Sequence, residues 1–194
     1  MDKIKINYNN NCANPSDINE HLPTLLKYGN ECSHITEMGV RWVSSTWALL
    51  LSNPNKIISY DIVKNEKINE VIELSNEYGI NYTFIESDVL LCEIEQTELL
   101  FIDTLHTYNQ LTMELNLHSE KVSKYIILHD TISFGHTDEI IYERSSDVVK
   151  TQSITKTGLM NAVNDFLLTE KGKNWFIYDI YENNNGLLVL KRKN

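Results

Sequence analysis

The chain has 194 residues, of which 42% are hydrophobic, and a formal net charge of −10 at pH 7. This length and composition are typical of a soluble globular protein, and we expect residues 1–194 to form a single domain. The negative charge argues against nucleic-acid binding, because proteins that follow a phosphate backbone are usually basic. No apolar run approaches the roughly 18 to 20 residues that a membrane span needs.

The first residues and the cysteines indicate a compartment. Residues 1–5 lack the apolar segment of a secretory signal peptide. Cys12, Cys32 and Cys92 are odd in number and do not have the spacing of a zinc site. Because disulfides form mainly in oxidising compartments, these features predict a cytoplasmic protein with unpaired thiols.

Strands and helices are predicted to alternate along the chain. Residues 1–14 are polar and rich in Asn, and we expect them to be irregular. Short apolar runs predict buried strands, and amphipathic patterns predict helices. The predicted helices are 17–29, 44–52, 64–78, 111–118 and 159–168. The predicted strands are 34–38, 56–60, 82–86, 99–102, 125–128, 175–181 and 187–190.

This alternation predicts an α/β fold with a doubly wound, mostly parallel, seven-stranded sheet. Asn185-Gly186 separates the last two strands, and Asn-Gly is a strong hairpin signal, so we expect the sheet to finish with an antiparallel pair. Residues 131–157 have weak periodicity. A connection of this length in a small domain is usually a lid, a binding loop or disordered.

Ionisable residues follow the fourth and fifth predicted strands. Asp103 ends the fourth strand and His106 comes shortly after it, while His129 and Asp130 end the fifth. Ligands of open α/β sheets bind at the carboxyl ends of the strands. Two carboxylates and two imidazoles at one edge therefore predict an active site. The alternatives are that His106 only caps the next helix and that the His129-Asp130 pair is structural.

The ends of the first three strands predict a nucleoside site. Glu37 and Gly39 follow the first strand, and glycine lets the backbone approach a ligand closely. The Gly-x-Gly-x-x-Gly pattern of dinucleotide sites is absent, and Glu37 suits a cationic group such as an amine or sulfonium. Asp61 could accept both hydroxyls of a ribose. Asp88, with Ser87 beside it, could accept from an adenine amino group.

Together these residues resemble a known family. From about residue 17 to 193 the chain is similar to class I S-adenosylmethionine-dependent methyltransferases, in Glu37-x-Gly39, in the acidic strand ends and in the terminal hairpin. The segments 102–108 and 129–131 resemble the branch that contains cephalosporin hydroxylase and rhamnosyl O-methyltransferases, as well as methyltransferase domains of glycan-building enzymes. One departure is clear, because the family's glycine-rich motif has two or three glycines and this chain keeps only Gly39.

The resemblance implies a cofactor, a metal and roles for individual residues. S-adenosylmethionine would bind at Glu37, Met38, Gly39, Ser44, Ser45, Asp61, Ile62, Ser87, Asp88 and Asp103. A divalent cation would be held by Asp103, His129 and Asp130; oxygen ligands favour Mg²⁺, and the imidazole shifts the preference toward Mn²⁺. Asp103, Asp130 and His106 would be catalytic, with His106 as general base toward a hydroxyl that the cation acidifies.

The expected acceptor is a hydroxyl of a sugar in a glycan, and the chain is expected to form homo-oligomers or to associate with glycosyltransferases. Three alternatives stay open. One is a non-catalytic nucleoside-binding or partner subunit with the same fold. Another is a methyltransferase that acts on a non-sugar small molecule. The third is a nicotinamide-dependent oxidoreductase, against which the missing glycine fingerprint counts.

Overall fold

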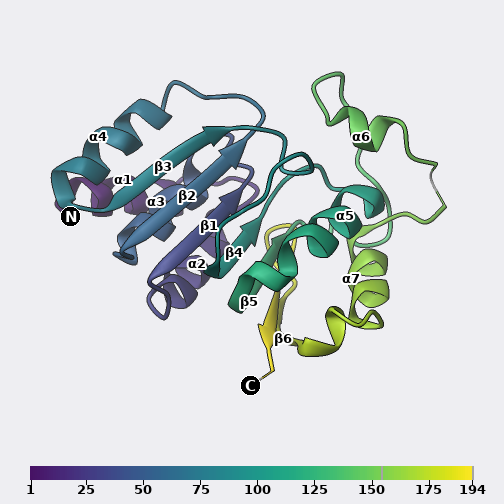
Figure 1. The fold of residues 1–194 in the computed structure, drawn as a ribbon. Coiled ribbons are helices and arrows are strands. Elements are labelled where there is room, and N and C mark those ends of the chain that lie inside the picture. Colours follow the sequence, from purple (N-terminus) through teal and green to yellow (C-terminus); the bar gives the residue numbers. More distant parts are fainter. Residues whose placement is uncertain (154, 194) are drawn as a thin grey trace.

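The computed structural model describes residues 1–153 and 155–193, so Ile154 of the predicted loop and Asn194 of the predicted domain lie outside the described residues. Figure 1 shows one twisted sheet between two layers of helices. The strands are β1 His34–Met38, β2 Lys56–Asp61, β3 Asn81–Glu86, β4 Thr97–Ile102, β5 Val122–His129, β6 Trp175–Tyr181 and β7 Leu187–Arg192. The α-helices are α1 Asp2–Ala13, α2 Leu22–Gly29, α3 Ser44–Leu51, α4 Ile68–Tyr78, α5 Tyr108–His118, α6 Asp147–Lys150 and α7 Leu159–Leu167. Short 3-10 helices are η1 Asn19–His21, η2 Ser119–Lys121 and η3 Gly172–Asn174.

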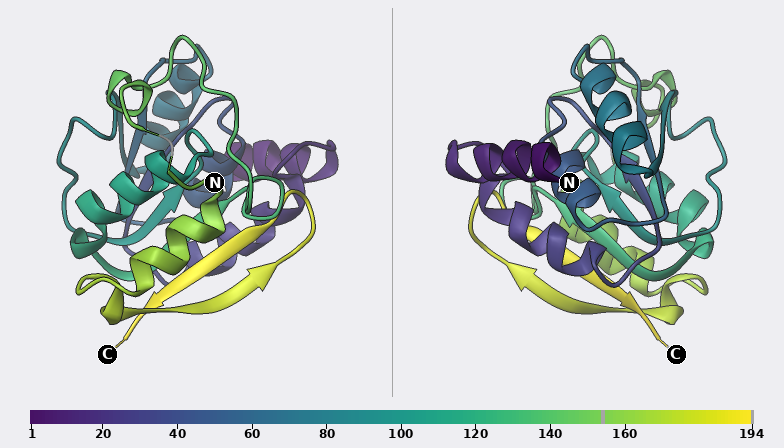
Figure 2. Two further views of the ribbon diagram at one scale, coloured as in Figure 1. Left: turned by 90° about the vertical axis from the view of Figure 1, so that its right-hand side faces the viewer. Right: turned by 90° about the vertical axis from the view of Figure 1, so that its left-hand side faces the viewer.

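The strand order is β3-β2-β1-β4-β5-β7-β6. The first five strands pair in parallel, whereas β7 runs antiparallel to both β5 and β6. The predicted mostly parallel, seven-stranded sheet with a C-terminal antiparallel hairpin is therefore confirmed. Figure 2 shows that this hairpin closes one side of the molecule.

The inner strands of the sheet are mostly buried on both faces, and this explains the continuous apolar runs of β4 and β5, whereas the edge strands β3 and β6 are partly exposed. In β5, Tyr125 and Ile127 pack into one core, and Ile126 and Leu128 pack into the other, because successive side chains point to opposite faces. Helices α1 to α4 contribute to the first core, and α5 and α7 contribute to the second. On α7, Leu159, Ala162, Val163 and Phe166 form the buried stripe.

The prediction that residues 1–14 are irregular is wrong. Residues 2–13 form α1, although only Ile4 is buried in it. Contacts from far along the chain hold this helix, because Lys3 pairs with Glu77 of α4 and Asn7 donates to Glu70 of the same helix. Two other predicted helices start late, at Leu22 rather than residue 17 and at Ile68 rather than residue 64. No helix among the described residues is both long enough and apolar enough to cross a bilayer.

The turn of the terminal hairpin packs against the chain at the carboxyl end of β5. Gly186 adopts a φ of +93°, and a Cβ at this position would lie 2.5 Å from the backbone nitrogen of Ile132. The Ile132 N–H donates to the carbonyl of Asn185 at 2.9 Å. The chain that leaves β5 is thus packed directly against the β6–β7 turn, which fixes the corner at Asp130.

Candidate active site

Gly39 directly follows β1 and contacts the residue that follows β4. The strand order reverses between these two neighbouring strands. The φ of Gly39 is +84°, and a Cβ there would lie only 2.0 Å from the carbonyl oxygen of Asp103. The Asp103 N–H donates to the carbonyl of Met38 at 2.8 Å, and the Gly39 N–H donates to that of Tyr60 at 2.9 Å. Such a reversal point is where open α/β sheets bind ligands, and glycine is what lets the β1 and β4 ends meet there.

Asp61 fixes the loop that follows Gly39. Its Oδ2 accepts the backbone N–H of Val40 at 2.8 Å and that of Arg41 at 3.0 Å, while its Oδ1 accepts that of Val63 at 3.1 Å. A carboxylate offers about four lone-pair positions, so one acceptor position is left for a ligand. The structure therefore gives Asp61 a supporting role and leaves it room for one ribose hydroxyl rather than the two that the sequence predicts, and this contact stays a prediction.

Glu37 is hydrogen-bonded to side chains of the protein, whereas the sequence predicts that it contacts a cationic ligand. It has no exposed surface, and its two oxygens accept from the hydroxyls of Ser45, Thr46 and Ser59 at 2.6 to 3.1 Å. Burial raises the pKa of Glu37 to about 7, although the three hydroxyls act in the opposite direction. Glu37 and Ser45 are thus hydrogen-bonded to each other, and their predicted contacts with a cofactor stay predictions.

The other residues predicted to bind the cofactor surround this loop. Ser87 and Asp88 are partly buried after β3, and Ile62 is exposed after β2. The partly buried hydroxyl of Ser44 donates to an asparagine of α1, at 3.0 Å. The side chain of Met38 lies in the second core, which leaves only its backbone for a ligand. Their contacts with a cofactor stay predictions.

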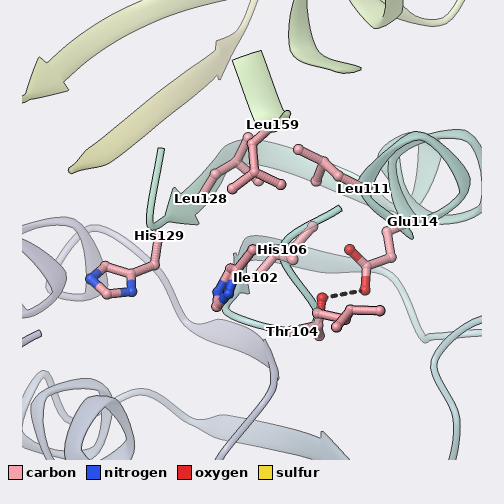
Figure 3. Close-up of a pocket in the computed structure, with 9 residues that line it drawn as sticks. Ile102, Thr104, His106, Leu111, Glu114, Leu128, His129 and Leu159 are labelled. Carbon is pink, nitrogen blue, oxygen red and sulfur yellow. Dashed lines mark hydrogen bonds between the residues drawn. The ribbon is translucent and has the colours of Figure 1, made fainter. Parts of the chain in front are cut away.

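The structure brings together the four groups predicted at the ends of β4 and β5. His106 Nε2 lies 3.2 Å from Asp103 Oδ1 and 3.0 Å from Asp130 Oδ2. His129 Nδ1 lies 3.2 Å and 3.3 Å from the same two oxygens. We name these four residues the inner cluster. Figure 3 shows the two imidazoles next to each other at the strand ends.

The outward nitrogens of both imidazoles are also hydrogen-bonded. His129 Nε2 lies 3.1 Å from the carbonyl oxygen of Asp17 and must donate to it, because a carbonyl only accepts. His106 Nδ1 lies 2.8 Å from Glu139 Oε2 and donates to that carboxylate. The His106 ring also stacks on Phe134, with 5.0 Å between centroids and 4° between planes. Both rings are therefore held in one orientation.

The charges of the cluster change the pKa of each member. Burial alone would raise the pKa of Asp103, but the positive charge of His129 and the hydrogen bond from His106 hold it far below its usual range. Burial disfavours the charged form of His106, yet its bonds to Asp103 and Glu139 raise its pKa to about 10. Asp103 likewise raises the pKa of the buried His129 to about 10. Without a cation both imidazoles are protonated at neutral pH, so neither can accept a proton.

The inner cluster fits a divalent cation. One ligand atom from each of Asp103, His129 and Asp130 can be chosen so that all lie within 4.8 Å of one another. Asp130 is 5% exposed, and its buried Oδ1 has no hydrogen-bond partner among the described residues. An unpaired buried acceptor costs about 1 to 3 kcal/mol, a cost that a cation would relieve. Two carboxylates with imidazole suit Mn²⁺ and similar ions.

Glu139 and Glu114 are two residues of the site that the sequence did not indicate. Glu139 lies in the weakly periodic loop, where no spacing links it to His106. Glu114 is fully buried on α5 and accepts from Thr104 at 2.6 Å and from Gln110 at 2.7 Å (Figure 3). It lines a small cavity beside His106. A signal for Glu114 existed, since a charged residue stands on the apolar face of a predicted helix.

Comparison with known proteins identifies the fold. No protein-family model matches the sequence, and no curated protein matches it. Among solved structures, a Staphylococcus aureus protein provisionally assigned as a caffeoyl-CoA O-methyltransferase is 14% identical, with a TM-score of 0.59 over 90% of this chain and 83% of that one. The N-methyltransferase NodS of Bradyrhizobium japonicum, in complex with S-adenosylhomocysteine, is 10% identical, with a TM-score of 0.62 over 96% and 97%.

A third similar structure is the Burkholderia thailandensis 1,6-didemethyltoxoflavin-N1-methyltransferase, with bound 1,6-didemethyltoxoflavin and S-adenosylhomocysteine. It is 9% identical, with a TM-score of 0.64 over 92% of this chain and 79% of that one. At such identities the similarity concerns the fold. The chain has the Rossmann-like fold of class I S-adenosylmethionine-dependent methyltransferases.

Proposed function

We propose that this chain is an S-adenosylmethionine-dependent O-methyltransferase that uses a divalent cation. The observation that carries the proposal is that Asp103 contacts both parts of the site. Its backbone packs against Gly39, in the loop where a nucleoside would bind, and its carboxylate belongs to the inner cluster. A methyl donor and a cation-bound hydroxyl would thus be held on either side of one residue.

The cofactor half of the proposal rests on the loop after β1. Gly39 allows the close approach that a methionine moiety needs, and the partly buried Asp61 keeps one acceptor position for ribose. Asp88 and Ser87, after β3, would contact the adenine. S-adenosylhomocysteine occupies two of the similar methyltransferase structures, which is consistent with this assignment.

The acceptor half rests on the inner cluster. Asp103, His129 and Asp130 would hold Mn²⁺ or Mg²⁺, and a bound cation would lower the pKa of an acceptor hydroxyl and orient it. Methyl transfer needs little covalent assistance, so accurate positioning accounts for much of the rate. The corner at Asp130, where φ is +58°, supports this proposal, because the residues that follow it are hydrogen-bonded to the β6–β7 turn. His106 Nε2 points at the two carboxylates, which favours a role inside the cluster over the predicted role as general base.

For the acceptor we propose a sugar hydroxyl of a glycan. A sugar hydroxyl is a weaker acid than a phenol, so it benefits most from a cation. Trp42 is 57% exposed beside the Gly39 loop and could pack on the apolar face of a pyranose. The net charge of −10 suits a neutral acceptor better than a phosphorylated one.

Calorimetry and an acceptor panel test the proposal. S-adenosylhomocysteine should bind to the wild type, and NAD should not. A labelled methyl donor should then transfer its methyl group, in the presence of Mn²⁺, to rhamnosides or other glycosides rather than to catechols or amines. Binding of the nucleoside without transfer to any acceptor would favour a non-catalytic binding subunit. Transfer to catechols alone would keep the O-methyltransferase and exclude the glycan. Tight binding of NAD alone would contradict the whole proposal.

A further inference from the structure

His106 and His129 each direct one ring nitrogen at the same two carboxylate oxygens. The four distances between the inner nitrogens and Asp103 Oδ1 or Asp130 Oδ2 all lie between 3.0 and 3.3 Å. A general base would direct its free nitrogen at the acceptor. His106 directs Nε2 instead at the two oxygens that are placed to hold a cation. Both imidazoles therefore have one nitrogen within 3.3 Å of the two carboxylate oxygens.

The outward nitrogens of the two imidazoles are also hydrogen-bonded in similar ways. His106 Nδ1 donates to Glu139 at 2.8 Å, and His129 Nε2 donates to the carbonyl of Asp17 at 3.1 Å. Each bond engages the outward nitrogen and turns the other toward the centre of the cluster. Metal-bound histidines almost always donate their second nitrogen to a carboxylate or a backbone carbonyl in this way. Each ring therefore carries the outer partner that is typical of a metal ligand.

Glu139 holds His106 at three points, which is more than a chance ion pair requires. Its Oε2 also accepts the backbone N–H of His106 at 3.2 Å, and its own N–H donates to the carbonyl of His106 at 2.9 Å. The stacked Phe134 fixes the plane of the ring from the side. The side chain of His106 is 16% exposed, so solvent has little access to it. The ring is thus oriented before any cation arrives.

We propose that His106 Nε2 is a second imidazole ligand of the cation, with Glu139 as the residue that positions it. This inference rests on the cation of the proposed function and deepens it. The site then consists of two imidazoles and the carboxylates of Asp103 and Asp130. Two nitrogen ligands favour a first-row transition ion over Mg²⁺, because imidazole binds such ions well and Mg²⁺ prefers an all-oxygen shell. A first-row transition ion such as Mn²⁺ is accordingly the expected occupant.

Electron spin-echo measurements on the protein loaded with Mn²⁺ alone test this directly, because they count the nitrogens bound to the ion. We expect two imidazole nitrogens in the wild type and one in His106→Gln. His106→Gln should weaken Mn²⁺ binding about tenfold or more while weakening Mg²⁺ binding less, so the preference for Mn²⁺ should fall. Glu139→Gln should keep both nitrogens and weaken Mn²⁺ binding by roughly 10- to 100-fold, the usual effect of losing an outer partner. The matched control is His136→Gln, an exposed histidine of the same segment, which should change neither quantity.

The outcomes separate this inference from the proposed function. A single nitrogen in the wild type would overturn the role of His106 while leaving the cation and the methyl transfer intact. Failure of the wild type to bind Mn²⁺ would overturn both the inference and the cation, and calorimetry with S-adenosylhomocysteine would still report on the cofactor. If His106→Gln does not fold, as judged by circular dichroism, the nitrogen count of the wild type decides alone.

Discussion

The two halves of the site are completed in different ways. At the ends of β1 and β2, Glu37 and Asp61 have their oxygens engaged by hydroxyls and backbone N–H groups of the protein itself. At the ends of β4 and β5, the inner cluster places ionisable groups against one another and leaves Asp130 Oδ1 without a partner among the described residues. The first half is formed before a ligand binds. The second half has the electrostatics of a site that a cation completes.

The largest effect that follows from this comparison is expected for Asp103→Asn. The substitution removes a charge that faces both imidazoles, so Mn²⁺ binding should fall by about 100-fold or more, a loss of about 3 kcal/mol. Affinity for S-adenosylhomocysteine should stay within a few-fold, since the backbone contact with Gly39 remains. Calorimetry with each ligand measures both. The control Asp147→Asn, with a side chain that is 95% exposed, should change neither. Unchanged Mn²⁺ binding in Asp103→Asn would contradict the division between the two halves.

Gly39→Ala should damage the cofactor half. The new Cβ would lie 2.0 Å from the Asp103 carbonyl, so the loop must move, and S-adenosylhomocysteine should bind at least about tenfold more weakly, a loss of about 1.4 kcal/mol. Gly79→Ala is the matched control, because Gly79 has a φ of +73° but no atom of the described residues within 4 Å of the point that a Cβ would occupy. The control should show only the backbone strain, about 1 to 2 kcal/mol of stability, with normal binding. Equal ligand binding by the two variants would show that the close contact at Gly39 has no role.

Glu114 makes stability depend on pH. Burial raises its pKa from an ordinary value of 4.5 to about 7, although the hydrogen bonds from Thr104 and Gln110 oppose the change. The folded state therefore holds this proton more tightly than the unfolded state, so stability falls as the pH rises from about 4.5 to 7. From pH 5 to pH 8, the wild type should lose about 2 to 3 kcal/mol more than Glu114→Gln, which cannot titrate.

Urea unfolding of both proteins at the two pH values measures this difference. Glu170→Gln, at an exposed glutamate, is the control and should follow the wild type. A parallel pH dependence of wild type and Glu114→Gln would mean that Glu114 does not titrate in this range.

The smallest effect concerns the segment after Asp130. Asp138 Oδ1 accepts the backbone N–H of Tyr108 at 2.8 Å and that of Gly158 at 2.7 Å, and so ties both ends of the segment to the site. Residues 140–153, which include α6, lie between these anchors and project beyond the sheet (Figure 1). Hydrogen exchange in these residues should slow when cofactor and acceptor are both bound, because such loops exclude water from the reaction. Equal protection in free and bound protein would make the segment a static part of the fold.

The sequence predicts the parts of this fold that depend on local patterns. The strands at 34–38 and 175–181 match residue for residue. The first is a mostly buried inner strand, and the second is an edge strand rich in the aromatic and β-branched residues that favour strands. Helix α1 could not be predicted from local patterns, because its partners Glu70 and Glu77 lie more than 60 residues away in the sequence. The same holds for Glu139, which reaches His106 only through the path of an aperiodic loop. The inner cluster could be predicted because its members lie at or just after the ends of two neighbouring strands, whereas the protein's own hydrogen bonds to Glu37 could not.

The central claim is that a divalent cation in the inner cluster is needed for methyl transfer but not for cofactor binding. The most direct test is transfer of labelled methyl from S-adenosylmethionine to a glycoside panel in EDTA and then with Mn²⁺ added back, with S-adenosylhomocysteine binding measured under both conditions. The account predicts transfer with Mn²⁺, none in EDTA, and the same affinity for S-adenosylhomocysteine in both. Full transfer in EDTA, or loss of S-adenosylhomocysteine binding when the metal is removed, would contradict it.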